Sequence, residues 1–152
     1  MKTLRLGVVG YCPPSKFDEK KALEYLIDAF DKVNSDFPEH QITIIAGITN
    51  AGVLKLAYEE AKIRGWRTAG ICCKKAYAFE WFPTDEEPII VGENWGDESN
   101  AFVYGTKTPG HPHENGLDAL VRIGIGKQSL DEASKVREMQ KPTYEYDLPR
   151  LE

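Results

Sequence analysis

The chain has 152 residues, of which 41% are hydrophobic and 28% are charged, an ordinary composition for one globular domain with its own core. Its 24 acidic residues outnumber its 19 basic residues, which argues against binding to nucleic acid or to a membrane surface through bulk positive charge. No apolar run approaches the roughly 18–20 residues of a membrane span. We therefore expect neither nucleic acid nor membrane as a partner.

The first ten residues, MKTLRLGVVG, contain an apolar run that is too short for a secretory signal and instead predict a strand. The cysteines Cys12, Cys72 and Cys73 are odd in number and include an adjacent pair, which is a poor disulfide framework. A reducing compartment is the default for such a chain. We therefore expect a cytoplasmic protein with free thiols.

Short apolar runs then alternate with helical patterns, which is typical of an α/β fold with a parallel sheet. The first half predicts strand, helix, strand, helix and strand, in that order, over residues 4–9, 17–34, 42–46, 51–64 and 68–73. Apolar residues recur at the helical period in both predicted helices, and Gly65 stands where a helix C-cap is expected.

The second half begins with an irregular stretch, residues 74–116, which holds four of the nine prolines and two of the three histidines. So long an insert in a compact domain is often a functional loop or lid. It contains one short predicted strand at 88–91, and strand 118–125, helix 129–139 and strand 143–147 follow it. The whole pattern predicts a single Rossmann-like α/β domain over residues 1–152, with three layers and a mostly parallel central sheet.

Three turns follow predicted strands and precede predicted helices: Gly10–Lys16 (GYCPPSK), Ala46–Gly52 (AGITNAG) and Gly124–Ser129 (GIGKQS). The carboxyl ends of parallel strands share one edge of the sheet, where ligands bind. Free amides at a helix start, glycines and hydroxyls together suit a phosphate, although the same residues are common in turns that hold no ligand. The candidate ligand-binding residues are Gly10, Pro13, Gly47, Thr49, Asn50, Gly52, Gly124, Gly126, Lys127, Gln128 and Ser129.

The first turn differs from the usual dinucleotide-binding fingerprint. The segment Gly7–Gly10 lacks the G-x-G-x-x-G spacing, and two prolines follow it. No acidic residue closes the second strand to hold a ribose, since Ala46 and Gly47 stand there. An NAD-dependent dehydrogenase is therefore disfavoured.

The three turns carry a resemblance to a known family. A strand with Gly-x-x-Pro, a strand with AG-I-x-N-AG-V, and a strand leading into G-x-G-x-x-S-x-x-E resemble the SLOG superfamily. That group includes the LOG proteins (often labelled lysine decarboxylases), the molybdenum-cofactor carrier proteins and the YpsA-like proteins. The resemblance covers about residues 4–147 and implies a Rossmann-like fold with a nucleotide or phosphoribosyl ligand at the strand ends.

In LOG enzymes the motif P-G-G-x-G-T-x-x-E cradles the phosphate and supplies a catalytic glutamate that serves to cleave the base from a nucleoside 5′-monophosphate. Ser129 takes the place of the threonine here, and Glu132 takes that of the glutamate. The Arg-Lys pair of LOG enzymes has no counterpart, because no arginine occurs between Arg67 and Arg122. The resemblance therefore leaves two functions open: N-glycosidic hydrolysis, and a non-catalytic nucleotide-sensing or carrier module. A structural partner with empty turns is a weaker third.

The resemblance also implies a homodimer or larger homo-oligomer. Separately, we expect no bound cofactor. Glu132 itself has two interpretations. Ser129-Leu-Asp-Glu132 has the spacing of a capping box, which is a purely structural role. As the catalytic candidate, the Glu132 carboxyl orients a ribose hydroxyl or activates water for glycosidic cleavage.

The insert offers further candidates. His111 and His113 lack additional ligands at a known spacing, so we expect no metal site. Trp81, Phe82 and Trp95 suit either a lid that stacks on a base or packing in the core. A short helix through 100–104 is expected after the acidic pair that follows Gly96, with cap chemistry as the role of that pair.

Overall fold

The computed structural model describes residues 2–151. Strands and helices alternate along the chain, with one 3-10 helix, η1. In order, the elements are β1 (Lys2–Gly10), α1 (Glu19–Asp36), β2 (His40–Ala46), α2 (Gly52–Ile63), β3 (Arg67–Cys72), η1 (Lys74–Ala78), β4 (Ile89–Ile90), α3 (Ser99–Tyr104), β5 (Ala119–Ile123), α4 (Lys127–Glu138) and β6 (Thr143–Tyr146).

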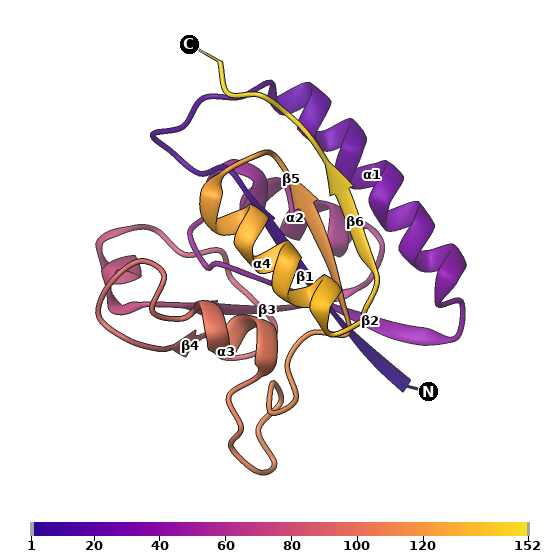
Figure 1. The fold of residues 1–152 in the computed structure, drawn as a ribbon, viewed down its shortest axis with the longest axis vertical. Coiled ribbons are helices and arrows are strands. Elements are labelled where there is room, and N and C mark those ends of the chain that lie inside the picture. Colours follow the sequence, from indigo (N-terminus) through magenta and orange to yellow (C-terminus); the bar gives the residue numbers. More distant parts are fainter. Residues whose placement is uncertain (1, 152) are drawn as a thin grey trace.

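The described strands form one six-stranded sheet in the order β4-β3-β2-β1-β5-β6, and every neighbouring pair is parallel (Figure 1). This confirms the predicted Rossmann-like α/β class. The strands lie near the centre because their side chains are apolar on both faces, as a parallel sheet covered by helices requires.

Helices cover both faces of the sheet. Leu6 and Val8 of β1 pack in the cluster that α1 and α2 complete. Val9, which alternation turns to the opposite face, packs with α3 and α4. Figure 1 shows α4 on the near side of the sheet and α2 on the far side. These two clusters give the three layers.

The predicted elements are all present, with shifts at their ends. Helix α1 begins at Glu19, because the Asp18 side chain accepts a hydrogen bond from the Lys21 amide and caps it. Strand β5 stops at Ile123 because Gly124 turns the chain with a φ of 109°. Helix α4 therefore starts two residues earlier than expected, at Lys127.

The insert after β3 has two parts, which lie at opposite ends of the strands. Its first part holds η1, β4 and α3, and β4 pairs with the last two residues of β3. Its last part, the loop between α3 and β5, reaches the start of β1, where Arg5 Nε donates to His113 Nδ1 over 3.3 Å. This loop forms the lowest part of Figure 1. No helix among residues 2–151 is long and apolar enough to cross a bilayer.

Candidate functional site

The strand order places a crevice beside β1. The chain leaves β1 toward β2, β3 and β4, and then returns to pair β5 with the other side of β1. Connections that leave in opposite directions from adjacent strands open a gap at their carboxyl ends, and this is where open α/β sheets bind ligands. The turns after β1 and after β5 flank that gap.

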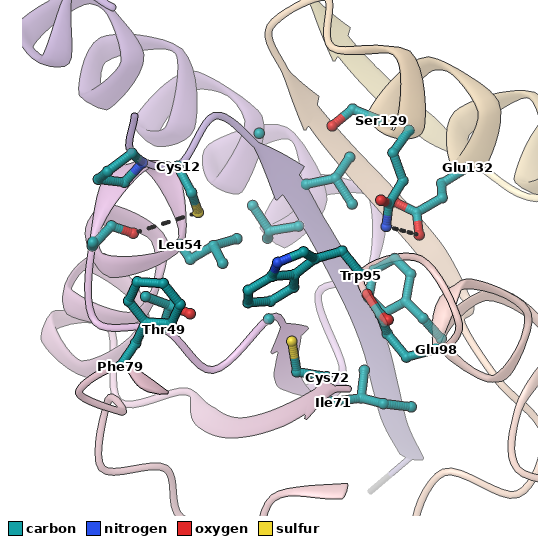
Figure 2. A pocket seen from close by; sticks show the side chains of 18 of the residues that line it. Cys12, Thr49, Leu54, Ile71, Cys72, Phe79, Trp95, Glu98, Ser129 and Glu132 are labelled. Carbon is teal, nitrogen blue, oxygen red and sulfur yellow. Dashed lines mark hydrogen bonds between the residues drawn. The ribbon is translucent and has the colours of Figure 1, made fainter. Parts of the chain in front are cut away.

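A cavity of about 470 Å³ occupies this position (Figure 2). Its volume falls in the range of pockets that hold small organic ligands. Its floor comes from β1 and β3, and its walls come from the turns after β1 and β2, the insert and the start of α4. The lining residues are Val8, Val9, Gly10, Cys12, Pro13, Pro14, Gly47, Thr49, Ala51, Leu54, Ile71, Cys72, Phe79, Trp95, Glu98, Phe102, Gln128, Ser129 and Glu132.

The structure brings seven of the candidate site residues together around this cavity: Gly10, Pro13, Gly47, Thr49, Gln128, Ser129 and Glu132. All three predicted turns contribute to it. The lining does not include Asn50, Gly52, Gly124, Gly126 or Lys127. The three turns thus converge as parallel strand ends must, and the roles of their residues toward a ligand stay predictions.

Several of the turn residues also have structural partners. The Asn50 Nδ2 group donates to Glu80 Oε2 over 2.8 Å, while Asn50 Oδ1 is buried without a partner in residues 2–151. The amide of Val53, in the first turn of α2, donates to the Tyr11 carbonyl over 2.8 Å. A side chain at Gly10 would meet Val53 Cγ1 at 2.6 Å, so glycine here permits the close packing of β1 on α2.

Tyr11 joins the first and third turns. Its ring is buried, and its hydroxyl accepts from the Ile125 amide over 2.9 Å and donates to the Leu148 carbonyl over 2.7 Å. Farther along, the Leu151 amide donates to the Lys16 carbonyl over 2.8 Å. The segment after β6 therefore binds both turns that flank the crevice.

The same segment brings a positive charge to the start of α4. The Arg150 guanidinium lies over the Tyr11 ring, 5.4 Å from its centroid. A Cβ built on Gly126 would lie 3.9 Å from Arg150 Nη2 and 4.0 Å from Ser129 Oγ. Arg150 thus lies close to the start of α4 and to the Ser129 hydroxyl, and of these residues Ser129 lines the cavity.

Glu132 is a buried acid. It lies in the second turn of α4, only 4% exposed, and its Oε2 accepts from Ser99 Oγ over 2.8 Å and from Gln128 Nε2 over 3.5 Å. Burial raises the pKa of Glu132 to about 7, and the nearby charge of Glu98 adds to the rise. The capping-box interpretation is wrong, because Gly126 is the N-cap and Glu132 bonds across to α3.

Glu98 brings a second carboxyl to the cavity. It is 8% exposed, immediately precedes α3, and accepts from the Gly96 amide at Oε2 over 3.1 Å. Neither lysine nor arginine is among the described residues that line the cavity. The lining is therefore mostly apolar, with two acidic groups and the neutral polar side chains of Thr49, Gln128 and Ser129, and it does not include Arg150.

Aromatic side chains complete the wall formed by the insert. Trp95 and Phe79 are 49% and 53% exposed, and their ring centroids are 5.9 Å apart. In Figure 2 the Trp95 indole lies in the middle of the view, with Phe79 on one side and the two carboxyls on the other. Trp81 instead donates its indole N–H to the Ala76 carbonyl, and Phe82 stacks on Tyr58 in the core. Of the three aromatics singled out from the sequence, only Trp95 lines the cavity.

The two thiols in the lining are poor nucleophiles. Burial raises the pKa of Cys12 to about 11 and that of Cys72 to about 12. The Cys12 thiol donates a long hydrogen bond, 3.9 Å, to the Ala51 carbonyl. At neutral pH both groups act as polarisable parts of the apolar wall.

The histidines lie away from the cavity. His113 is fully buried, with Nε2 2.8 Å from the Phe102 carbonyl, and burial lowers its pKa. Over residues 2–151 no group of three or more His, Cys, Asp or Glu side chains is placed to hold a metal ion.

The sequence did not predict three residues at or near the site: Phe79, Tyr11 and Arg150. Their roles depend on contacts between distant segments, and nothing in their local sequence marks them. Glu98 was recognised only as a helix-cap candidate. A signal for it exists in retrospect, because an acidic residue three positions after Trp95, in a long insert that follows a ligand-edge strand, is a reasonable cavity residue.

No family model matches the chain, and no curated protein matches it. Two solved structures of the molybdenum cofactor carrier protein from Chlamydomonas reinhardtii are similar to it, with TM-scores of 0.57 and 0.56 and identities of 19% and 17%. Each alignment covers 93% of this chain and 75% of the carrier chain. At this identity the similarity shows a common fold. The chain thus has a Rossmann-like fold, with its cavity at the topological switch point.

Proposed function

We propose that this chain is a non-catalytic binding module, a carrier or sensor, for a small ligand that combines a planar heterocycle with a phosphate group, as nucleotides do. The observation that carries the proposal is the cavity beside β1, where three turns, α4 and the aromatic insert meet. We also propose that the chain is one domain of the SLOG type and forms a homo-oligomer.

The apolar and aromatic walls support the heterocyclic part of the ligand. Val9 and Ile71 line the cavity from β1 and β3, and Trp95 and Phe79 line it as half-exposed rings of the insert. A planar ring that enters between floor and indole buries apolar area on both of its faces and stacks on the indole. Without a ligand, these two aromatic side chains expose apolar area to water, which is unfavourable.

The start of α4 supports the phosphate part. Its unbonded amides carry the positive end of the helix dipole, and Ser129 lines the cavity. Arg150 supplies the full positive charge that the LOG-like Arg-Lys pair supplies in the enzymes. The carboxyls of Glu98 and Glu132 keep a phosphate away from the far wall of the cavity.

The structural neighbours support carriage over turnover. Both are cofactor carriers by name, and their alignments include almost all of this chain. The alternative, hydrolysis of the N-glycosidic bond, is favoured by one observation: Glu132 is a buried carboxyl, with a pKa near neutral, in the cavity wall. Such a group has the protonation behaviour of a general acid.

Incubation with AMP, GMP, CMP, UMP, ADP and ATP tests the proposal, with the melting temperature, tryptophan fluorescence and released base measured on the same samples. We expect stabilisation by at least one nucleotide, roughly 5 °C at a hundredfold excess over its Kd, with quenched fluorescence and intact ligand. Trp95→Phe should abolish the quenching, since Trp66 and Trp81 lie outside the cavity lining.

Release of base by the wild type that is lost in Glu132→Gln would replace the carrier by the hydrolase. Absence of any stabilisation or quenching across the panel would overturn nucleotide binding at this cavity.

A further inference from the structure

We propose that Glu98 and Glu132 together read the heterocycle of the ligand, by accepting hydrogen bonds from an edge with two adjacent N–H donors. The 2-amino-4-oxopyrimidine edge of guanine is such an edge. This inference rests on the proposed function, because it names the class of ring that the cavity selects.

The first reason is that each carboxyl is held in place with one oxygen to spare. Glu132 Oε2 accepts from Ser99 and Gln128, and Glu98 Oε2 accepts from the Gly96 amide. Within residues 2–151 no hydrogen bond reaches Oε1 of either glutamate. Both side chains are more than nine-tenths buried, and both line the cavity. A ligand placed there meets two fixed carboxyl oxygens, and both accept once Glu132 is deprotonated, above its pKa of about 7.

The second reason is the cost that a mismatched ligand would bear. The two Oε1 atoms are not among the buried side-chain atoms of residues 2–151 that lack a partner, so they reach solvent in the free protein. A ligand that covers them must supply N–H donors in place of water. The bonds to Ser99 and Gly96 fix the two carboxyls before the ligand arrives. Pre-organised acceptors discriminate strongly, because a ring that lacks the matching donors leaves them desolvated and unpaired.

The third reason is that the surroundings fit a ring better than another polar group. Phe102 and Ile71 line the cavity with the carboxyls, and Trp95 stands three residues before Glu98. An anion is disfavoured beside two acidic groups that have no lysine or arginine in the lining. Ser129 lies one helical turn before Glu132 on α4, so a phosphate and a ring edge would contact successive turns of one helix.

Isothermal titration of the wild type with GMP, IMP and AMP is the test. IMP lacks the 2-amino donor, and AMP presents an acceptor where guanine has N1–H. We expect GMP to bind about tenfold or more tightly than either. This comparison needs no variant, so it does not depend on whether a substituted protein folds.

Variants then assign the preference to the two carboxyls. In Glu98→Gln and Glu132→Gln the preference for GMP over IMP should fall to within about threefold, while AMP binding changes little. Glu138→Gln makes the same chemical change on an exposed position of α4 and should keep the full preference.

Equal affinity for GMP, IMP and AMP would overturn this inference and leave the proposed binding function standing. Equal affinity for the three together with weaker binding of dGMP would also overturn it, by assigning the carboxyls to the ribose hydroxyls. Binding of none of these nucleotides would overturn both the inference and the function on which it rests.

Discussion

At the scale of single residues, the pKa of the Glu132 carboxyl is determined by its surroundings. Burial raises its pKa from 4.5 to about 7. The unfolded chain loses this proton at a lower pH than the folded chain, so the folded state gives up stability as pH rises from 4.5 to about 7. Below pH 4.5 the carboxyl is protonated in both states, so Glu132 no longer makes the stability depend on pH.

Glu132→Gln should therefore stabilise the protein above neutral pH. At pH 8 the folded wild type bears the cost of a buried charge, which the shift places at ~3 kcal/mol as an upper bound, while the neutral amide does not. We expect a higher urea midpoint for the variant at pH 8 and nearly equal midpoints at pH 4.5, as measured by tryptophan fluorescence.

Glu138→Gln is the control for this change, since it alters an exposed acid on the same helix. It should leave the free energy of unfolding within about 0.5 kcal/mol of wild type at both pH values. A variant Glu132→Gln that is less stable than wild type at pH 8 would contradict the buried, raised-pKa description.

At the scale of elements, the turns after β1 and β5 depend on a third segment. Tyr11 receives the Ile125 amide and donates to Leu148, and Arg150 lies on the Tyr11 ring. Arg122, buried in β5, donates to the Gly124 carbonyl and forms an ion pair with Asp147 at 2.9 Å. The segment after β6 therefore helps to hold the turn that leads into α4.

Tyr11→Phe tests this bracing. The change leaves the ring in place but leaves the Ile125 amide and the Leu148 carbonyl without their partner, which should cost about 1–3 kcal/mol of unfolding free energy. Urea unfolding measures the loss. Tyr77→Phe removes a hydroxyl from a ring that is 65% exposed and should cost little. Equal effects of the two changes would contradict the bracing role.

Arg150→Ala tests whether the same segment contacts a phosphate, as the proposed function requires. GMP should bind roughly tenfold more weakly to the variant, whereas guanosine, which has no phosphate, should bind as it does to the wild type. Lys16→Ala is the matched control for a lost positive charge in the neighbouring turn, where the Lys16 backbone carbonyl alone accepts from Leu151. Equal losses for GMP and guanosine would mean that Arg150 acts through packing on Tyr11.

At the scale of the whole molecule, the two ends of the strands differ in what they contact. The carboxyl ends of the strands line the cavity, whereas the loop between α3 and β5 is bonded to β1 through His113 and Arg5. Strands β1, β2 and β5 lie inside the sheet with both faces covered, while β4 has two residues and β6 is only partly buried.

Hydrogen exchange should follow this arrangement. Amides of β1, β2 and β5 should exchange only through global unfolding, whereas those of β4 and β6 should exchange through smaller openings, several orders of magnitude faster. Peptide-level mass spectrometry in deuterated buffer measures this order. Protection of β6 as strong as that of β1 would contradict it.

A feature can be predicted from the sequence when the contacts that form it join residues close together in the chain. The strands and long helices follow from local periodicity, and the convergence of three turns follows from parallel topology. Glu132 was predicted as a site residue, but its partner Ser99 lies 33 positions away, and no local pattern links them. Trp95 and Trp81 look alike in sequence, and only the fold of the insert places one at the cavity and the other against Ala76.

The strand order has a consequence for how the protein is made. Strand β1 is synthesised before the other strands of the sheet, yet its neighbour β5 and the helix α4 follow more than a hundred residues later. A nascent chain that already contains β1 to β4 thus has one side of β1 unpaired and half a cavity. We therefore expect no stabilisation by a ligand at this stage, because the cavity is complete only once Gln128, Ser129 and Glu132 of α4 have been synthesised.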